Sequence, residues 1–255
     1  MGLFHIPRVA LACARGLAQR RRSLAPPAAA SPSSPPPPPP LPVAGIGPDH
    51  PHLYHGTAGI LDVDYLGHLN NAAYLVHAEL ARWEMAASNG SLGRMWEDRD
   101  RGTAFLVAGT TVRYRREVEA FRRFRIDTHV GAVDGRNLWV YHAFRYPGSG
   151  SGSSSGAGSG SKSGSAPDAG GRVLAQVLVQ AVVVRDRKVL DPAAYLTDVV
   201  GADPDLVGRL AEIGRAGGDI DDHLGDDALM GEKRARYLDL EEALRASAAA
   251  DDEGR

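Results

Sequence analysis

The densest group of polar side chains in the sequence lies between residues 62 and 74, in the run Asp-Val-Asp-Tyr-Leu-Gly-His-Leu-Asn-Asn-Ala-Ala-Tyr. Within it, Asp64 is the acid nearest the start of a predicted helix. A carboxylate at such a position can act as a nucleophile or as a general base. The first turn of the helix would supply unpaired N–H groups and a positive dipole end, which stabilise negative charge on a reacting carbonyl oxygen. One short segment therefore combines an acid with an electrophilic site.

Each of these residues also has a structural alternative. Asp62 and Asp64 could simply hydrogen-bond the turn or the helix start, as Asp commonly does. His68 could bond Asp64, position water or contact a substrate, and it could equally pack against the helix start. Asn70 and Asn71 suit a helix cap and a turn first, and substrate contacts second. The residues alone leave these alternatives open.

A long helix follows this cluster. Apolar residues recur at steps of three and four, which predicts one buried stripe. The members of this stripe are Ala72, Val76, Leu80, Trp83 and Ala87. Asn70 is the expected N-cap, and Asn89-Gly90 marks the expected end. A second short helix is expected within residues 91–103.

Strands dominate the rest of the central region. Runs with alternating or β-branched residues predict strands at 57–63, 105–116, 123–133, 138–146 and 173–184. Asp134-Gly135 predicts a hairpin turn. The last run is apolar on both faces, so we expect a central strand, with the helix on one side and a partner subunit on the other. The order of elements is strand, long helix, then four antiparallel strands.

The spacing in the polar cluster resembles a known family. An Asp, a His four residues later, an Asn pair and a Tyr ten residues after the Asp are similar to the 4-hydroxybenzoyl-CoA thioesterase branch of the hot-dog superfamily, especially to proteins of the thioesterase superfamily member six type. Glu79, Arg82 and the run 112–116 extend the resemblance, which spans about residues 53 to 200. It implies an α+β hot-dog fold, an antiparallel sheet wrapped around a long central helix. It also implies an enzyme that hydrolyses an acyl-CoA or related thioester, with coenzyme A as part of the substrate and no separate cofactor.

The resemblance also implies roles for individual residues. Asp64, His68 and Asn71 are the expected catalytic residues; the expected substrate contacts are Asn70, Ala72, Tyr74, Glu79, Arg113 and Arg115. Some hot-dog enzymes place a second carboxylate on this helix, but the spacing of Glu79 and Arg82 favours a structural ion pair. Arg113 and Arg115 suit the phosphates of coenzyme A, and a solvated strand edge explains them equally well.

Two further expectations concern the whole protein. Hot-dog domains of this kind pair their sheets, so we expect a homodimer or a dimer of dimers. The alternatives to an enzyme are a protein that binds acyl groups or lipids without turning them over, and a scaffold protein that recruits partners through its low-complexity segments.

Composition divides the chain into three parts. Residues 1–48 contain five arginines and no acid, and they end in a Pro-rich linker; we expect a disordered extension with a targeting peptide. A mitochondrial address is the first expectation, with a plastid or the endoplasmic reticulum membrane surface as alternatives. Residues 49–215 are the expected hot-dog domain, with a flexible Gly/Ser-rich insert at 148–171. Residues 216–255 form an acidic tail, expected to be partly helical or disordered.

Several classes of function are disfavoured. The net charge of −2 lacks the basic excess of a nucleic-acid-binding surface. The only cysteine, Cys13, lies in the extension, so a disulfide or thiolate metal site is not expected in the domain. His50, His52 and His55 have loose metal-ligand spacing, but linker residues are the better interpretation. The stretch from Leu3 to Leu17 is too short and too interrupted to predict a membrane span.

Overall fold

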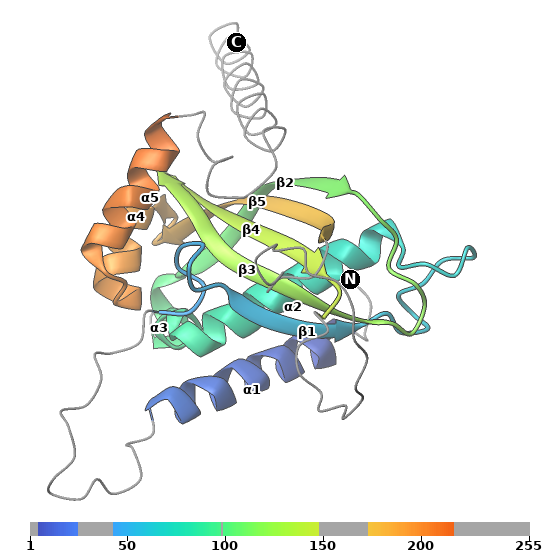
Figure 1. The fold of residues 1–255 in the computed structure, drawn as a ribbon. Helices are drawn as coiled ribbons and strands as arrows, with labels where there is room; N and C mark the ends of the chain where they lie inside the picture. The colour runs from blue at the N-terminus through green and yellow to red at the C-terminus, as the bar shows by residue number, and fades with distance from the viewer. Residues whose placement is uncertain (1–4, 25–42, 98, 148–172, 217–255) are drawn as a thin grey trace, which may run out of the picture.

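The computed structural model describes residues 5–24, 43–97, 99–147 and 173–216. Its centre is an antiparallel sheet in the order β1-β3-β4-β5-β2, with β6 paired to β5, curled around the long helix α2 (Figure 1). The elements are α1 (His5–Leu24), β1 (His52–Thr57), α2 (Asn71–Asn89), α3 (Ser91–Glu97), β2 (Ala104–Tyr114), β3 (Arg123–Asp134), β4 (Asn137–Arg145), β5 (Val173–Arg185), β6 (Lys188–Val189), α4 (Pro192–Ala194) and α5 (Pro204–Ala216), with a 3-10 turn at Arg99–Arg101 and a π-helical turn at Tyr195–Val200. This is the hot-dog arrangement that the family resemblance implies.

The boundaries of α2 are those predicted. The side chain of Asn70 accepts a hydrogen bond from the Ala73 backbone N–H at 2.9 Å, so it caps the first turn. Gly90 ends the helix in the left-handed conformation, with φ of 93°, where a residue with a Cβ would be strained. Local sequence signals therefore fix both ends of the element on which the site is built.

The buried face of α2 differs from the predicted stripe. Ala72 is exposed, whereas Ala73, Tyr74, Ala78 and Ala81 are buried. The reason is that α2 is covered on two sides, by the sheet and by α1, so its buried surface is wider than one stripe.

Four of the five predicted strands are confirmed as β2, β3, β4 and β5, and Asp134 and Asn137 pair across the expected hairpin. The first was wrong, because β1 spans His52–Thr57 and the chain then turns. His52 and His55 are accordingly strand residues, not linker residues. His52 and Tyr54 are buried and alternate with exposed Leu53 and His55, and the inward-facing histidine hid this alternation in the sequence.

Residues 5–24, which composition assigns to an extension, form a helix that packs along α2 (Figure 1). Ala12 and Gly16 are buried in this contact. A Cβ atom on Gly16 would clash with the Glu84 carbonyl oxygen and lie 2.7 Å from Ala87 Cβ, so the two helices approach closely only because residue 16 is glycine. The Pro-rich linker, the Gly/Ser insert and the acidic tail lie outside the described residues. Within the described residues, no helix is both long enough and apolar enough to cross a membrane.

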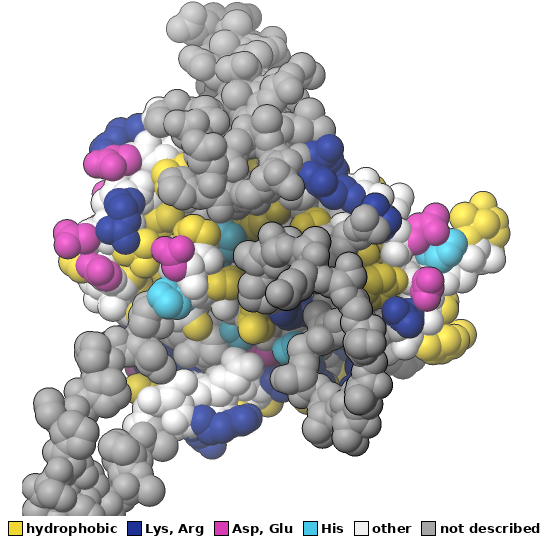
Figure 2. All heavy atoms as spheres, in the orientation of Figure 1, with side chains coloured by type: hydrophobic (Ala, Val, Ile, Leu, Met, Phe, Trp, Pro, Cys, Tyr) yellow, Lys and Arg dark blue, Asp and Glu magenta, His cyan; other side chains and the backbone are white. Residues whose placement is uncertain are grey.

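A loop between β1 and α2 projects from one end of the molecule (Figures 1 and 2). It exposes the large side chains of Ile60, Leu61, Tyr65 and Leu66. The same loop carries Asp64, so this residue lies at the periphery of the fold, whereas Asp62 and Tyr74 of the same polar cluster are buried.

Candidate active site

A cleft of about 750 Å³ lies where this loop meets the start of α2 and the ends of β2, β4 and β5. It brings together five of the predicted site residues, Asp64, His68, Asn71, Tyr74 and Arg115. Its other lining residues are Leu66, Leu69, Tyr114, Arg116, Glu117, Glu119, Tyr146 and Leu174. Asn70, Ala72, Glu79 and Arg113 do not line it.

Asp64 is held by its own turn. Its Oδ1 atom accepts hydrogen bonds from the backbone N–H groups of Leu66 at 2.9 Å and His68 at 3.4 Å. This is the local pattern that Asp commonly forms in turns. Its Oδ2 atom accepts no hydrogen bond from the described residues, although Asp64 lines the cleft. One oxygen is therefore fixed by the turn, and the other is not engaged by the described residues.

His68 points its ring at a different acid. Its Nε2 atom lies 3.2 Å from Glu117 Oε2, and it is the backbone of His68 that contacts Asp64. Among the roles expected for His68, a ring hydrogen bond to Asp64 is therefore not formed. The ring lies at the cleft wall beside Glu117.

The first turn of α2 forms another wall. Asn71 is the first helical residue, and its carbonyl accepts a hydrogen bond from the Tyr114 hydroxyl at 3.3 Å. The Tyr74 hydroxyl donates to the Arg116 carbonyl at 3.5 Å, and its ring packs edge-on against Tyr114. Burial raises the pKa of Tyr74 to about 12, so the hydroxyl stays protonated. Asn70 caps the helix, and exposed Ala72 lies outside the cleft.

Only one of the two arginines predicted to contact the substrate lines the cleft. Arg115 and Arg116 line it, and Arg115 donates from Nε to Gln176 Oε1 at 3.0 Å. Arg113 lies on β2 outside the lining. The acids Glu117 and Glu119 were missed, and they follow directly after the basic run in the sequence, which was the available signal. The mouth therefore carries both signs of charge.

A buried polar network connects the loop between β1 and α2 to the helices α1 and α2. Asp62 Oδ1 lies 2.9 Å from Arg8 Nη1 of α1, and Asp62 Oδ2 lies 3.3 Å from His77 Nε2 of α2. The other ring nitrogen of His77 lies 3.2 Å from the Tyr54 hydroxyl. Burial alone would raise the pKa of Asp62, but the hydrogen bonds from His77 and Arg8 outweigh it and lower the pKa to about 2. Asp62 is thus a charged anchor for the segment that presents Asp64.

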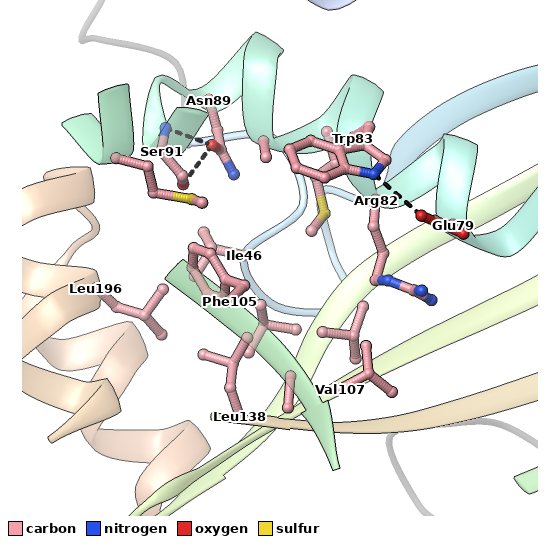
Figure 3. Close-up of a pocket in the computed structure, with 16 residues that line it drawn as sticks. Ile46, Glu79, Arg82, Trp83, Asn89, Ser91, Phe105, Val107, Leu138 and Leu196 are labelled. Atoms are coloured by element: carbon pink, nitrogen blue, oxygen red, sulfur yellow. Dashed lines mark hydrogen bonds between the residues drawn. The ribbon is translucent and has the colours of Figure 1, made fainter. Parts of the chain in front are cut away.

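Glu79 belongs to a second cavity, between α2 and the sheet (Figure 3). The prediction of an ion pair between Glu79 and Arg82 was wrong, because each side chain contacts other described residues. Glu79 accepts from Trp83 Nε1 at 3.4 Å and lies 3.3 Å from His5 Nε2 of α1. Arg82 instead contacts His142 Nε2 at 3.2 Å. The residue beside Glu79 is thus His5 of α1, a helix whose packing the sequence did not predict.

The described residues contain no group of three or more His, Cys, Asp or Glu side chains that could hold a metal ion. The polar atoms of the cleft are carboxylates, one imidazole, hydroxyls, guanidinium groups and the N-terminus of α2. Such a set can bind an anionic or thioester-containing molecule and activate water or attack a carbonyl carbon.

The chain is similar in sequence and in fold to known proteins. A model of the Thioesterase-like superfamily matches residues 58–198. Protein THEM6 of Xenopus laevis is 32% identical over 93 residues, which cover 36% of this chain and 44% of that protein; Protein THEM6 of Danio rerio is 29% identical over 90 residues, covering 35% and 43%. The chain spans less than half the length of these curated relatives. The structure of Slr0204, a 1,4-dihydroxy-2-naphthoyl-CoA thioesterase from Synechocystis, aligns with a TM-score of 0.44 at 12% identity, covering 58% of this chain and 94% of that one.

Proposed function

The chain belongs to the Thioesterase-like superfamily, and from this premise we propose that it hydrolyses an acyl-CoA, or a related acyl thioester, to the free acid and the thiol. The observation that carries the proposal is the position of Asp64. It presents a carboxylate at the wall of a large cleft, one loop before the N-terminus of α2, with one oxygen fixed by the turn and the other without a hydrogen-bond partner among the described residues.

Two routes use this carboxylate. In the first, Asp64 Oδ2 attacks the thioester carbonyl carbon, the thiolate leaves, and water hydrolyses the resulting mixed anhydride. In the second, Asp64 takes a proton from a water molecule that attacks the carbonyl directly. Both routes place negative charge on the carbonyl oxygen. The first-turn N–H groups of α2, near Asn71, are the groups that stabilise this charge in the proposal.

The remaining cleft residues bind and position the substrate in this proposal. Arg115 and Arg116 are suited to the phosphates of coenzyme A, because guanidinium groups form paired hydrogen bonds with phosphate oxygens. Tyr74 and His68 form the wall beside Asp64. We expect the assembly to be a homodimer or a dimer of dimers, and a stable monomer in gel filtration would count against that arrangement.

A second candidate function is binding of acyl groups or lipids without turnover. The observation in its support is the apolar cavity between α2 and the sheet, whose walls could hold an apolar group without any reaction. The two candidates differ only in whether Asp64 reacts.

The test of the proposal is thiol release from a panel of thioesters. Short, medium and long aliphatic acyl-CoAs and aromatic acyl-CoAs are incubated with the full chain, and free thiol is measured over time. We expect saturable thiol release with at least one class of acyl group. If none of the panel is cleaved while acyl-CoAs still bind, the binding function replaces the enzymatic one.

A further inference from the structure

The second cavity, between α2 and the sheet, is separate from the Asp64 cleft, and no described residue lines both. Its volume is about 160 Å³, and most of its walls are apolar, including Trp83, Phe105 and Leu138. An apolar cavity of roughly 150 Å³ is large enough to take up benzene, so this one suits a body of about six carbons.

One cation lines these apolar walls. Figure 3 shows Arg82 reaching from α2 toward the strands. The guanidinium has five N–H donors, and the hydrogen bond that the structure records for it runs from Nη1 to His142 Nε2, at 3.2 Å. Arg82 forms no ion pair with any carboxylate among the described residues.

The His142 ring carries no negative charge that could pair with Arg82. It is fully buried, and burial lowers its pKa well below the usual value, with the charge of Arg82 adding to the effect. The neutral ring therefore accepts a hydrogen bond from Arg82 at Nε2, and its Nδ1–H donates to Thr128 Oγ1 at 2.9 Å. Burial also lowers the pKa of Arg82 to about 10, against the opposing influence of Glu79.

The Glu79 carboxylate lines the same cavity but is engaged elsewhere. It accepts from Trp83 Nε1 and lies beside His5 of α1. The cavity thus has apolar walls and a guanidinium whose hydrogen bond among the described residues is to His142. Glu79 acts on Arg82 through its charge but forms no ion pair with it among the described residues. A buried guanidinium that lines an apolar cavity is costly unless its N–H groups are bonded, and a bound anion in contact with it would reduce that cost.

We propose that this cavity binds a small amphiphilic carboxylate, with its apolar body between α2 and the sheet and its carboxylate paired with Arg82. The carboxylate is that of a free short-chain acid, because the cavity is separate from the cleft that holds Asp64. The proposal therefore does not depend on hydrolysis at Asp64.

The first experiment compares hexanoate with hexanamide by titration calorimetry on the full chain. The two ligands share the apolar body and differ in charge. We expect hexanoate to bind at least about tenfold more tightly, as expected for one desolvated charge pair of 1.4 kcal/mol or more. Equal affinity of acid and amide, or binding of neither, would overturn the proposal without any variant.

Variants then locate the site. Arg82→Gln should remove the preference for the acid, and Ala86→Leu, which fills the cavity from α2, should weaken both ligands. Arg94→Gln is the matched control, because Arg94 is an exposed arginine on α3 outside the cavity. Retention of the acid preference in Arg82→Gln, or its loss in Arg94→Gln, would contradict the assignment.

Discussion

At the scale of single residues, the geometry of Asp64 is compatible with both of the roles that the sequence presented as alternatives. Its Oδ1 atom holds the turn, and its Oδ2 atom accepts no hydrogen bond from the described residues. The residue type and its distance from the helix start were sufficient to predict the position. Which oxygen is occupied depends on the backbone path through Leu66 and His68, and the sequence does not specify that path.

The sequence analysis missed the polar network behind Asp64, because its members are far apart in the sequence. Arg8 and Asp62 are 54 positions apart, and His77 lies 15 positions beyond Asp62. No local spacing links them, because their contact requires α1 to pack on α2. A histidine on a helix face gave no signal in the sequence beyond an ordinary core position.

Buried His129 provides a test at this scale. Its two ring nitrogens form no hydrogen bond in the described structure, and burial lowers its pKa to about 4, with Asp49 acting weakly in the opposite direction. The unfolded chain therefore binds one more proton than the folded chain between pH about 4 and about 6.5. The contribution of His129 to stability is complete above that window and is lost as the pH falls through it.

We expect His129→Phe to reduce the pH dependence of the unfolding free energy in this window by about 1.4 kcal/mol per pH unit, the value for one proton. Urea denaturation at several pH values measures it. His55→Phe is the control, because His55 lies on the exposed face of β1. An unchanged slope in His129→Phe would mean that the histidine is protonated in the folded protein.

At the scale of elements, most of the fold follows from local patterns. Asn70 and Gly90 delimit α2, and alternation of apolar residues identifies the four long strands. Several elements were not predicted, among them β1 and α1. Strand β1 turns a histidine inward, against Glu84 at 3.5 Å, so its alternation is not one of apolar and polar residues. Helix α1 has the basic, acid-free composition of a presequence, which says nothing about where the helix packs.

Gly16 tests the docking of α1. In a free helix, Gly16→Ala should stabilise by up to about 1 kcal/mol. In the docked helix the new methyl group meets the Glu84 carbonyl and Ala87, so we expect a loss of about 1 to 3 kcal/mol in unfolding free energy. The thermal midpoint of each variant distinguishes the two situations.

Gly208→Ala is the matched control for this comparison. Gly208 lies in α5, and nothing within 4 Å surrounds the position of its Cβ. This substitution should raise the midpoint slightly by the same helix preference. A rise in both variants would contradict the packing of α1 against α2.

At the scale of the whole molecule, the N-terminal region combines a composition typical of a targeting peptide with a helix that packs on the domain. We propose, from its five arginines and absence of acids, that residues 1–48 direct the chain to mitochondria. The same region contributes Arg8 to the network behind Asp64. Cleavage after import would remove the counter-ion of a buried carboxylate, which is strongly destabilising unless the chain rearranges.

A reporter fused after residue 48 tests the address. We expect it to enter mitochondria, with at least part of the segment removed. Microscopy together with the size of the imported product gives the readout. A reporter that stays in the cytosol would assign residues 5–24 to the fold alone. A reporter that enters the endoplasmic reticulum would replace the mitochondrial address with that one.

The central claim is that Asp64 performs thioester hydrolysis, and Asp64→Asn tests it most directly. Asn nearly matches Asp in shape and can still accept the turn hydrogen bonds at Oδ1, but it is neither a base nor a competent nucleophile. Single-turnover thiol release and the thermal midpoint are measured on the same preparation. The account predicts a fall in the cleavage rate of about a hundredfold or more, a nearly unchanged midpoint and nearly unchanged substrate affinity. Full cleavage by Asp64→Asn, with or without a stability loss of roughly 1 kcal/mol from a weakened turn, would contradict it.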